Sequence, residues 1–240
     1  MSAAGALPRP AVVLAVQLGF RMASRRLAAR RTLLALALGL ALALTGAAVE
    51  VSVGAAGAVD RALLATFRLV LPLVAFALCA DAADRDRLRD AAWPAARFGA
   101  SRSAVALGLV TAAALACAAA GALLAVAVVV AAHRPDVAAP LAHDALVSAW
   151  IGALAGAAYA GWYSLGATFF RRGRGRLVPL AADLFLGGSL GIAGALLPRG
   201  NAVNLIGGPA PLDLAQPSSA AWLALSAVIL GLAAALRCRE

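Results

Sequence analysis

Long blocks of apolar residues, separated by short polar segments, run through the whole chain. Each block is about 20 residues or more, the length that a helix rising 1.5 Å per residue needs to cross the hydrocarbon of a bilayer. The blocks are too long and too uniformly apolar for the alternating strands of a β-barrel, and open sheet edges cannot be satisfied in lipid. The pattern predicts an all-α integral membrane protein with six transmembrane helices, at about residues 32–54, 62–80, 104–132, 143–169, 177–197 and 219–236.

Two segments outside these spans also have an informative pattern. Residues 11–31 place Arg21 and Arg25 on one helical face and apolar residues on the other, which predicts an N-terminal interfacial helix in contact with membrane lipid. A plain basic flank of the first span is the alternative. Residues 198–217 are rich in Pro and Gly yet apolar, and they predict an outer re-entrant hairpin before the last span.

Composition supports a single transmembrane domain over residues 1–240. Of the residues, 63% are hydrophobic and 13% are charged, whereas a soluble domain is about half apolar and a quarter charged. The net charge of +10 does not indicate a nucleic-acid partner, because the basic residues lie in short loops between apolar blocks.

The basic residues also predict the orientation. All 21 are arginines, since the chain contains no lysine, and 17 of them fall on one side of the predicted membrane against three on the other. Basic loops face the cytoplasm, so we expect a multi-pass protein of the plasma (inner) membrane with both termini cytoplasmic. The cytoplasmic side receives six arginines before the first span, five between the second and third, four between the fourth and fifth, and two at the tail.

Few residues have the chemistry of a catalytic or metal site. Without lysine, the phosphate-binding loop of nucleotide hydrolases cannot be built, so any ATP hydrolysis belongs to a partner subunit. The two histidines, His133 and His143, have Asp136 and Asp144 close in sequence; these four residues could bind a metal, but we expect a solvated polar loop instead. The three cysteines are predicted to be buried apolar residues. We therefore expect no catalytic residue, no cofactor and no metal, and a protein that is not an enzyme by itself. The cysteines are Cys79, Cys117 and Cys238.

Three charged residues lie inside predicted spans, where an unpaired charge costs on the order of 3 kcal/mol. Glu50 and Arg68 are close enough in depth for an ion pair between neighbouring helices. Asp183 lies nearer the cytoplasmic side, where we expect it to face a cavity or a second protomer. The alternative for all three is a role in helix packing without a part in transport.

Small residues recur at a spacing of four in two spans. Gly152 and Gly156 belong to the fourth span, and Gly187 and Gly191 to the fifth. This spacing is typical of helices that approach closely, and here it gives weak support for tight packing or dimerisation.

The longest predicted cytoplasmic connection is residues 81–103, which carries charges of both signs. It also contains Trp93 and Phe98, which a solvated loop would not need, although a bilayer interface would use them equally well. The segment predicts one or two short helices, broken at Pro94.

The order of these parts resembles the membrane (permease) subunit of type-2 ABC exporters: a basic interfacial helix, six spans, a charged cytoplasmic segment after the second span, and an outer hairpin before the last. The local sequence is similar in three stretches. These are VQLGFRMASRRLAARRTLLALALGL at the N-terminal entry, WPAARFGASRSAVALG before the third span, and LLPRGNAVNLIGGPAPL after the fifth.

This resemblance implies a dimer of six-helix subunits, homomeric or heteromeric, each docked onto a separate cytoplasmic ABC ATPase. Residues 81–103 would be the coupling segment, with Trp93, Arg97, Phe98 and Arg102 as the candidate contacts with the ATPase. The alternatives are a self-contained secondary transporter or channel, and a membrane scaffold protein.

Overall fold

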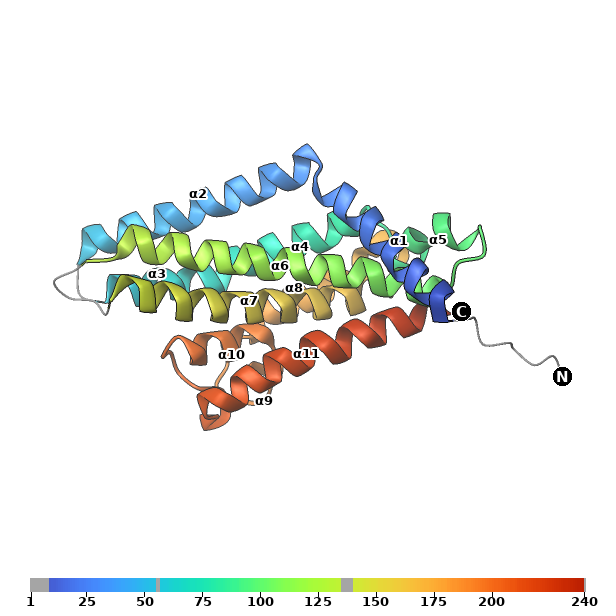
Figure 1. The fold of residues 1–240 in the computed structure, drawn as a ribbon. Helices are drawn as coiled ribbons and strands as arrows, with labels where there is room; N and C mark the ends of the chain where they lie inside the picture. The colour runs from blue at the N-terminus through green and yellow to red at the C-terminus, as the bar shows by residue number, and fades with distance from the viewer. Residues whose placement is uncertain (1–8, 55–56, 135–139, 240) are drawn as a thin grey trace.

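The structure, a computed structural model, describes residues 9–54, 57–134 and 140–239. Helices joined by short turns make up this part of the chain, and no strand occurs in it (Figure 1). Five of the described helical segments are long and apolar enough to cross a membrane. The all-α architecture predicted from the apolar pattern is therefore confirmed.

Five of the six predicted spans correspond to these long helices, with ends that differ by a few residues. The second span is one continuous helix that changes to a π-helical turn near its middle and is named in three parts. The helices are α2 (Arg30–Val53), α3 (Ala58–Ala65) with η1 (Thr66–Val70) and α4 (Leu71–Ala82), α6 (Arg102–Ala132), α7 (Leu141–Gly166) and α11 (Gln216–Leu236).

The fifth predicted span, 177–197, is not a single helix. A 3-10 helix, η2 (Arg171–Arg176), leads into α8 (Leu177–Leu186), which has only ten residues and is therefore about 15 Å long. The chain then turns before a five-residue helix, α9 (Ile192–Leu196). Helix α8 alone therefore covers about half of the hydrocarbon thickness. Helix α8 ends just before Gly187 and Gly188, and glycine is unfavourable in a helix interior.

The predicted hairpin 198–217 is partly helical and well packed. It contains α10 (Pro198–Leu205) and a short 3-10 helix, η3 (Pro211–Asp213), and α10 packs against α7 and α11. Asn204 on α10 donates hydrogen bonds through Nδ2 to the carbonyl oxygen of Leu214 and to the hydroxyl of Ser219. These bonds satisfy polar groups in an otherwise apolar region.

The predicted interfacial helix 11–31 is shorter than expected and ends at Leu27, so that α1 is Arg9–Leu27 and α2 begins after a bend (Figure 1). Instead of lying apart from the bundle, α1 crosses α6. A Cβ atom on Gly19 would lie 2.0 Å from the carbonyl oxygen of Val105, and one on Gly108 would lie 2.0 Å from that of Val16. Glycines on both helices allow this close crossing.

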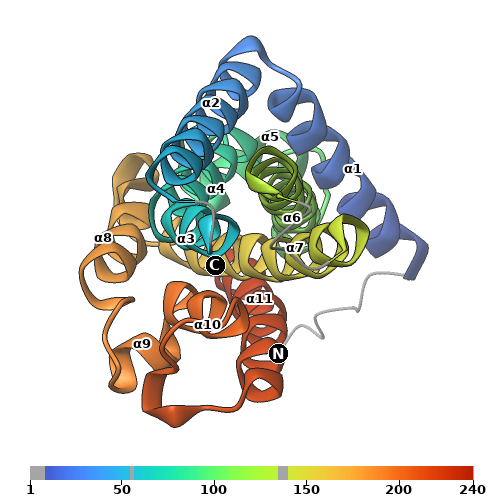
Figure 2. The same cartoon turned by 90° about the vertical axis from the view of Figure 1, so that its left-hand side faces the viewer.

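The centre of the bundle is the contact between α6 and α7 (Figure 2). A Cβ atom on Gly121 would lie 2.1 Å from the carbonyl oxygen of Gly152, and one on Gly152 would lie 2.3 Å from the carbonyl oxygen of Gly121. Likewise, a Cβ atom on Gly156 would lie 2.1 Å from the carbonyl oxygen of Cys117. The spacing of Gly152 and Gly156 therefore reflects close helix packing, whereas Gly187 and Gly191 lie at the turn after α8.

The segment 81–103 contains one helix, α5 (Leu88–Ala96), and Pro94 lies inside it, so the predicted break at this proline is wrong. The proline falls in the last turn, where losing one backbone hydrogen bond does little to a helix that ends at Ala96. Helix α5 lies at the same end of the bundle as α1 and the C-terminal 3-10 helix, η4 (Arg237–Arg239) (Figure 1). This end is called the α5 end below.

Candidate functional site

Helix α5 is amphipathic and presents aromatic side chains to its surroundings. Its inner face, which includes Leu88, Ala92 and Ala95, is buried against the bundle, with α6 as its main neighbour. On the outer side, Trp93 is 51% exposed, and Phe98, just beyond the helix, is 83% exposed. Large exposed aromatic side chains of this kind are typical of interaction surfaces or of membrane interfaces.

Each of the two aromatic rings has an arginine stacked on it. The guanidinium carbon of Arg102 lies 4.7 Å from the centroid of the Trp93 ring, and that of Arg97 lies 5.2 Å from the Phe98 centroid. Cation–π contacts hold such rings in a defined orientation. The structure thus brings the four residues predicted for coupling together as two stacked pairs, which we call the α5 platform.

The start of α5 is tied to the segment that follows α7. The backbone N–H of Leu88 donates to the carbonyl oxygen of Ala167 at 3.2 Å, and Arg87 Nε donates to the carbonyl oxygen of Phe170. Arg176 donates through Nη2 to the carbonyl oxygen of Asp86 at 2.8 Å. These hydrogen bonds connect the start of α5 to η2 and to the residues just before it.

The ion pair between Glu50 and Arg68 that their depths would allow is not formed. Glu50 instead accepts a hydrogen bond from Arg61 Nε at 2.7 Å, and Arg61 also donates to the carbonyl oxygen of Gly54. Arg61 lies on the first turn of α3, directly across the connection from the end of α2. Arg61, which is nearer than Arg68, therefore pairs with the Glu50 carboxylate close to the end of the bundle opposite α5.

Arg68 lies inside the π-helical turn η1, ten residues after the start of α3 and so about 15 Å along the helix. Its side chain is exposed, and it makes no hydrogen bond or ion pair with any residue that the structure describes. π-Helical turns recur at functional sites. A charge at this depth requires water or another protein surface beside it.

Asp183 is buried, with 1% of its surface exposed, at the point where three helices meet. It accepts a hydrogen bond from the Tyr159 hydroxyl of α7 at 2.8 Å, and another from the backbone N–H of Arg199 at 3.1 Å. Arg199 belongs to the first turn of α10, so Asp183 also compensates the positive end of that helix. The carboxylate joins α7, α8 and α10.

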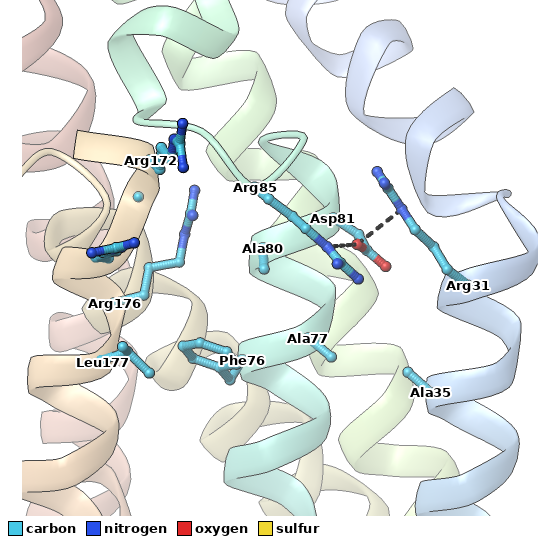
Figure 3. A pocket seen from close by; sticks show the side chains of 12 residues that line it. Arg31, Ala35, Phe76, Ala77, Ala80, Asp81, Arg85, Arg172, Arg176 and Leu177 are labelled. Atoms are coloured by element: carbon cyan, nitrogen blue, oxygen red, sulfur yellow. Dashed lines mark hydrogen bonds and ion pairs between the residues drawn. The ribbon is translucent and has the colours of Figure 1, made fainter. Parts of the chain in front are cut away.

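A cavity of about 340 Å³ opens at the α5 end, between α2, α4 and η2 (Figure 3). Arg31 lies on one side of it and Arg172 and Arg176 lie on the other, with α4 between them. We call this space the basic cavity. Five guanidinium groups and a single carboxylate, Asp81, line it; the arginines are Arg31, Arg85, Arg172, Arg174 and Arg176.

Asp81 organises one side of the basic cavity. It is buried, accepts a hydrogen bond from the Thr32 hydroxyl at 2.9 Å, and pairs with Arg31 at 3.0 Å and Arg85 at 3.4 Å. Arg31 also donates to Asp84 at 2.9 Å, and this hydrogen bond lowers the pKa of the Asp84 carboxyl. Residues of α2 are thereby connected to the end of α4 and to the turn that follows it.

The opposite side of the basic cavity is built from an unusual turn. Phe170, Arg172 and Gly173 have φ values of 52°, 55° and 61°, so the chain passes through the left-handed region before η2 settles into α8. Arg176 is only 2% exposed, and its Nε has no hydrogen-bond partner in the described residues. Burial lowers the pKa of the Arg176 guanidinium from its usual value, although the group stays cationic.

Sequence reasoning did not identify the basic cavity or Asp81. A usable signal was present: the first two spans are joined by a short connection, so they are antiparallel neighbours and Thr32 must lie near Asp81. The sequence indicated less clearly that Arg172 and Arg176 line the cavity, because their positions depend on the irregular turn that leads into η2. In the described part of the chain, no three His, Cys, Asp or Glu residues come together as metal ligands.

Comparisons with known proteins leave the fold and the site to be interpreted from the chain itself. No protein-family model, no curated protein and no solved structure matches it.

Proposed function

We propose that the chain is the transmembrane subunit of an ATP-driven exporter of the type-2 ABC class, coupled to a separate cytoplasmic ATPase. The observation that carries the proposal is the α5 platform: two exposed aromatic rings, each stacked with an arginine, on a short helix at one end of a membrane bundle. Aromatic residues and arginine are enriched where proteins dock. In this role the platform receives the movement of the ATPase and passes it to η2 and α8.

The proposal includes six crossings with both termini in the cytoplasm of a plasma membrane. Its support is that helices α1 and η4 lie at the same end of the bundle, as they would after an even number of crossings. Helix α8 together with α9 supplies the fifth crossing in broken form. Residues 198–217, with α10 and η3, then serve as the outer re-entrant hairpin, which begins at Pro198 and whose helix α10 is covered by α7 and α11.

A second permease subunit, identical or different, completes the proposed exporter. Helix α8 buries only Pro179 and Asp183 and leaves Phe185 85% exposed. Arg68 is also exposed and lacks a partner among the described residues, so a pathway between two subunits would supply the water or protein surface that it requires.

Co-purification tests the proposal. With a candidate ABC ATPase from the same genome co-expressed, mild detergent should recover the two proteins together, and the double variant Trp93→Ala/Phe98→Ala should lose the ATPase. Trp150→Ala is the matched control, because Trp150 is 63% exposed but lies on α7, away from the α5 platform. If no ATPase co-purifies, or if the double variant retains it as well as the control does, the proposal fails.

The buried Asp183 favours a second candidate, a secondary transporter that needs no ATPase. Membrane-embedded carboxylates are used in ion coupling, and this one is linked to three helices. Proton- or sodium-driven uptake into liposomes containing only this chain, abolished in Asp183→Asn, would support this candidate over the exporter.

A further inference from the structure

The basic cavity continues into an apolar groove. The groove, of about 180 Å³, lies between α2 and the continuous helix of η1 and α4, and it shares Ala35 and Ala77 with the basic cavity. Figure 3 shows these two alanines on the Arg31 side of the cavity, across it from Arg172 and Arg176. The structure therefore places a strongly cationic space directly beside an apolar one, at the end of two membrane-spanning helices.

The cationic part has unused binding capacity. Asp81 is already engaged by Arg31 and Arg85, so it does not neutralise the other three arginines of the cavity. The side chains of Arg172 and Arg174 form no hydrogen bond or ion pair with any described residue, and Arg176 keeps a buried Nε without a partner. Guanidinium groups that line one cavity can donate hydrogen bonds to the oxygens of a phosphate group.

The apolar part is lined by side chains that suit a hydrocarbon chain. Leu38 and Leu42 of α2 face Leu69 and Leu73 of the neighbouring helix across it, and all four are exposed in the described chain. At Gly39 the two helices come close, since a Cβ atom there would lie 2.4 Å from Val74 Cγ2. The contact at Gly39 gives the groove a floor, and the leucines form its walls.

We propose that the basic cavity and this groove together bind one anionic phospholipid, with the phosphate head group among Arg172, Arg174 and Arg176 and an acyl chain along the groove. A free phosphate ion would satisfy the arginines but would leave the groove empty. A zwitterionic lipid would bring a cationic group among the same arginines. The lipid of the surrounding leaflet has both required parts and reaches the site without crossing water.

The site follows from the cavity and its charges and does not depend on the proposed function. Lipid binding is therefore measured on the purified chain alone, without an ATPase. The chain is reconstituted in nanodiscs of phosphatidylcholine with a small fraction of phosphatidylglycerol, extracted in mild detergent, and analysed by native mass spectrometry for the lipid that it retains.

The test compares two double variants that remove the same charge at the same end of the bundle. Arg172→Gln/Arg174→Gln changes the cavity, and Arg89→Gln/Arg239→Gln changes exposed positions of α5 and η4 that do not line the cavity. The first should reduce retained phosphatidylglycerol about tenfold, as expected for losing charge-assisted hydrogen bonds, and the second should leave it unchanged. Equal loss in both variants would overturn the proposal, because general surface charge would then explain the binding.

A groove variant separates a lipid from a free phosphate ion. Leu73→Trp fills the groove and leaves every arginine in place, so it should also reduce lipid retention, with circular dichroism confirming that the helices are intact. If Leu73→Trp retains lipid fully, or if millimolar inorganic phosphate displaces the lipid from the unmodified chain, the ligand is an ion and the lipid proposal is wrong.

Discussion

Asp183 illustrates how a single residue connects elements that are far apart in the sequence. Its two carboxylate oxygens accept hydrogen bonds from a side chain on α7 and from the backbone of α10, while the residue itself belongs to α8. A buried donor left without an acceptor costs free energy, since no water replaces the lost partner. The position of α8 therefore depends on this one carboxylate.

Replacing Asp183 should destabilise the protein in proportion to the donors left unpaired. Asp183→Leu leaves the Tyr159 hydroxyl and the Arg199 N–H without a hydrogen-bond acceptor. We expect it to lower the free energy of unfolding by about 1–3 kcal/mol for each unpaired donor. Asp183→Asn keeps one acceptor oxygen and should lose less. Thermal unfolding in detergent measures both, and equal stability of the leucine variant and the unmodified chain would contradict this role.

A double variant checks that Tyr159 acts through the same hydrogen bond. Tyr159→Phe removes the hydroxyl, so adding it to Asp183→Leu should cost less than it does alone. Fully additive losses would show that the two residues contribute independently.

At the residue scale, the sequence indicates which charges need partners but not which partners they find. Glu50 requires a cation near the end of α2, and Arg61 and Arg68 are both within reach along the helix. The choice of Arg61 depends on how the connection after α2 turns, which hydropathy does not encode. Burial of Cys79, Cys117 and Cys238 was predictable because it requires only an apolar environment. The contact between Cys79 Sγ and Cys117 Sγ, at 3.7 Å, was not predictable, because it depends on the register in which α4 packs on α6.

At the scale of elements, the contact of α6 with α7 sets the geometry of the bundle. Neither helix has a side chain at Gly121 or Gly152, so the two backbones touch, and van der Waals packing replaces the hydrophobic effect that is missing in lipid. The predicted Gly152 and Gly156 spacing pointed to this contact, but its partner positions on α6 became visible only in the structure.

Adding a side chain at this contact should force α6 and α7 apart. In Gly121→Val the Cβ atom would lie 2.1 Å from a backbone oxygen, and we expect a loss of about 1–3 kcal/mol or more in the free energy of unfolding. Gly46→Val is the control, because a Cβ atom on Gly46 of α2 meets nothing within 4 Å. Similar unfolding temperatures for the two variants would contradict the close packing.

The broken fifth span shows what hydropathy misses at this scale. Residues 177–197 are apolar enough for a full crossing, and a window average does not distinguish a continuous helix from a half-length helix followed by a turn. The pair Gly187 and Gly188 was a local sign of the break, but isolated glycines are common in membrane helices. The buried polar contacts of Asp183 and Asn204 stabilise the irregular region, and they connect residues 15 or 16 positions apart.

At the scale of the whole molecule, the two ends of the bundle differ in charge and in structure. The α5 end carries the basic cavity, the α5 platform and the helices α1 and η4, whereas the opposite end carries the Glu50–Arg61 pair. The arginine asymmetry in the sequence predicts which end faces the cytoplasm. Loop composition was sufficient for that prediction, because it does not depend on how the helices pack.

Accessibility of single cysteines tests this orientation. In a chain whose three buried cysteines are replaced by alanine, a membrane-impermeant maleimide applied to intact cells should label Asp60→Cys. It should reach Asp90→Cys and Arg239→Cys only after the cells are permeabilised, since these exposed positions lie at the α5 end. Labelling of Asp90→Cys in intact cells would reverse the orientation, and opposite results for Asp90→Cys and Arg239→Cys would exclude an even number of crossings.

The contact between Gly121 and Gly152 also constrains how this sequence can diverge. A clash between two side chains is relieved when the second residue becomes smaller, which leaves a correlated pair of exchanges among homologues. Here each added Cβ atom would meet a carbonyl oxygen of the backbone, and no exchange in the partner helix removes a carbonyl. Homologues that keep this arrangement should therefore hold both positions as glycine without compensating exchanges, even where the lipid-facing residues around them have changed freely.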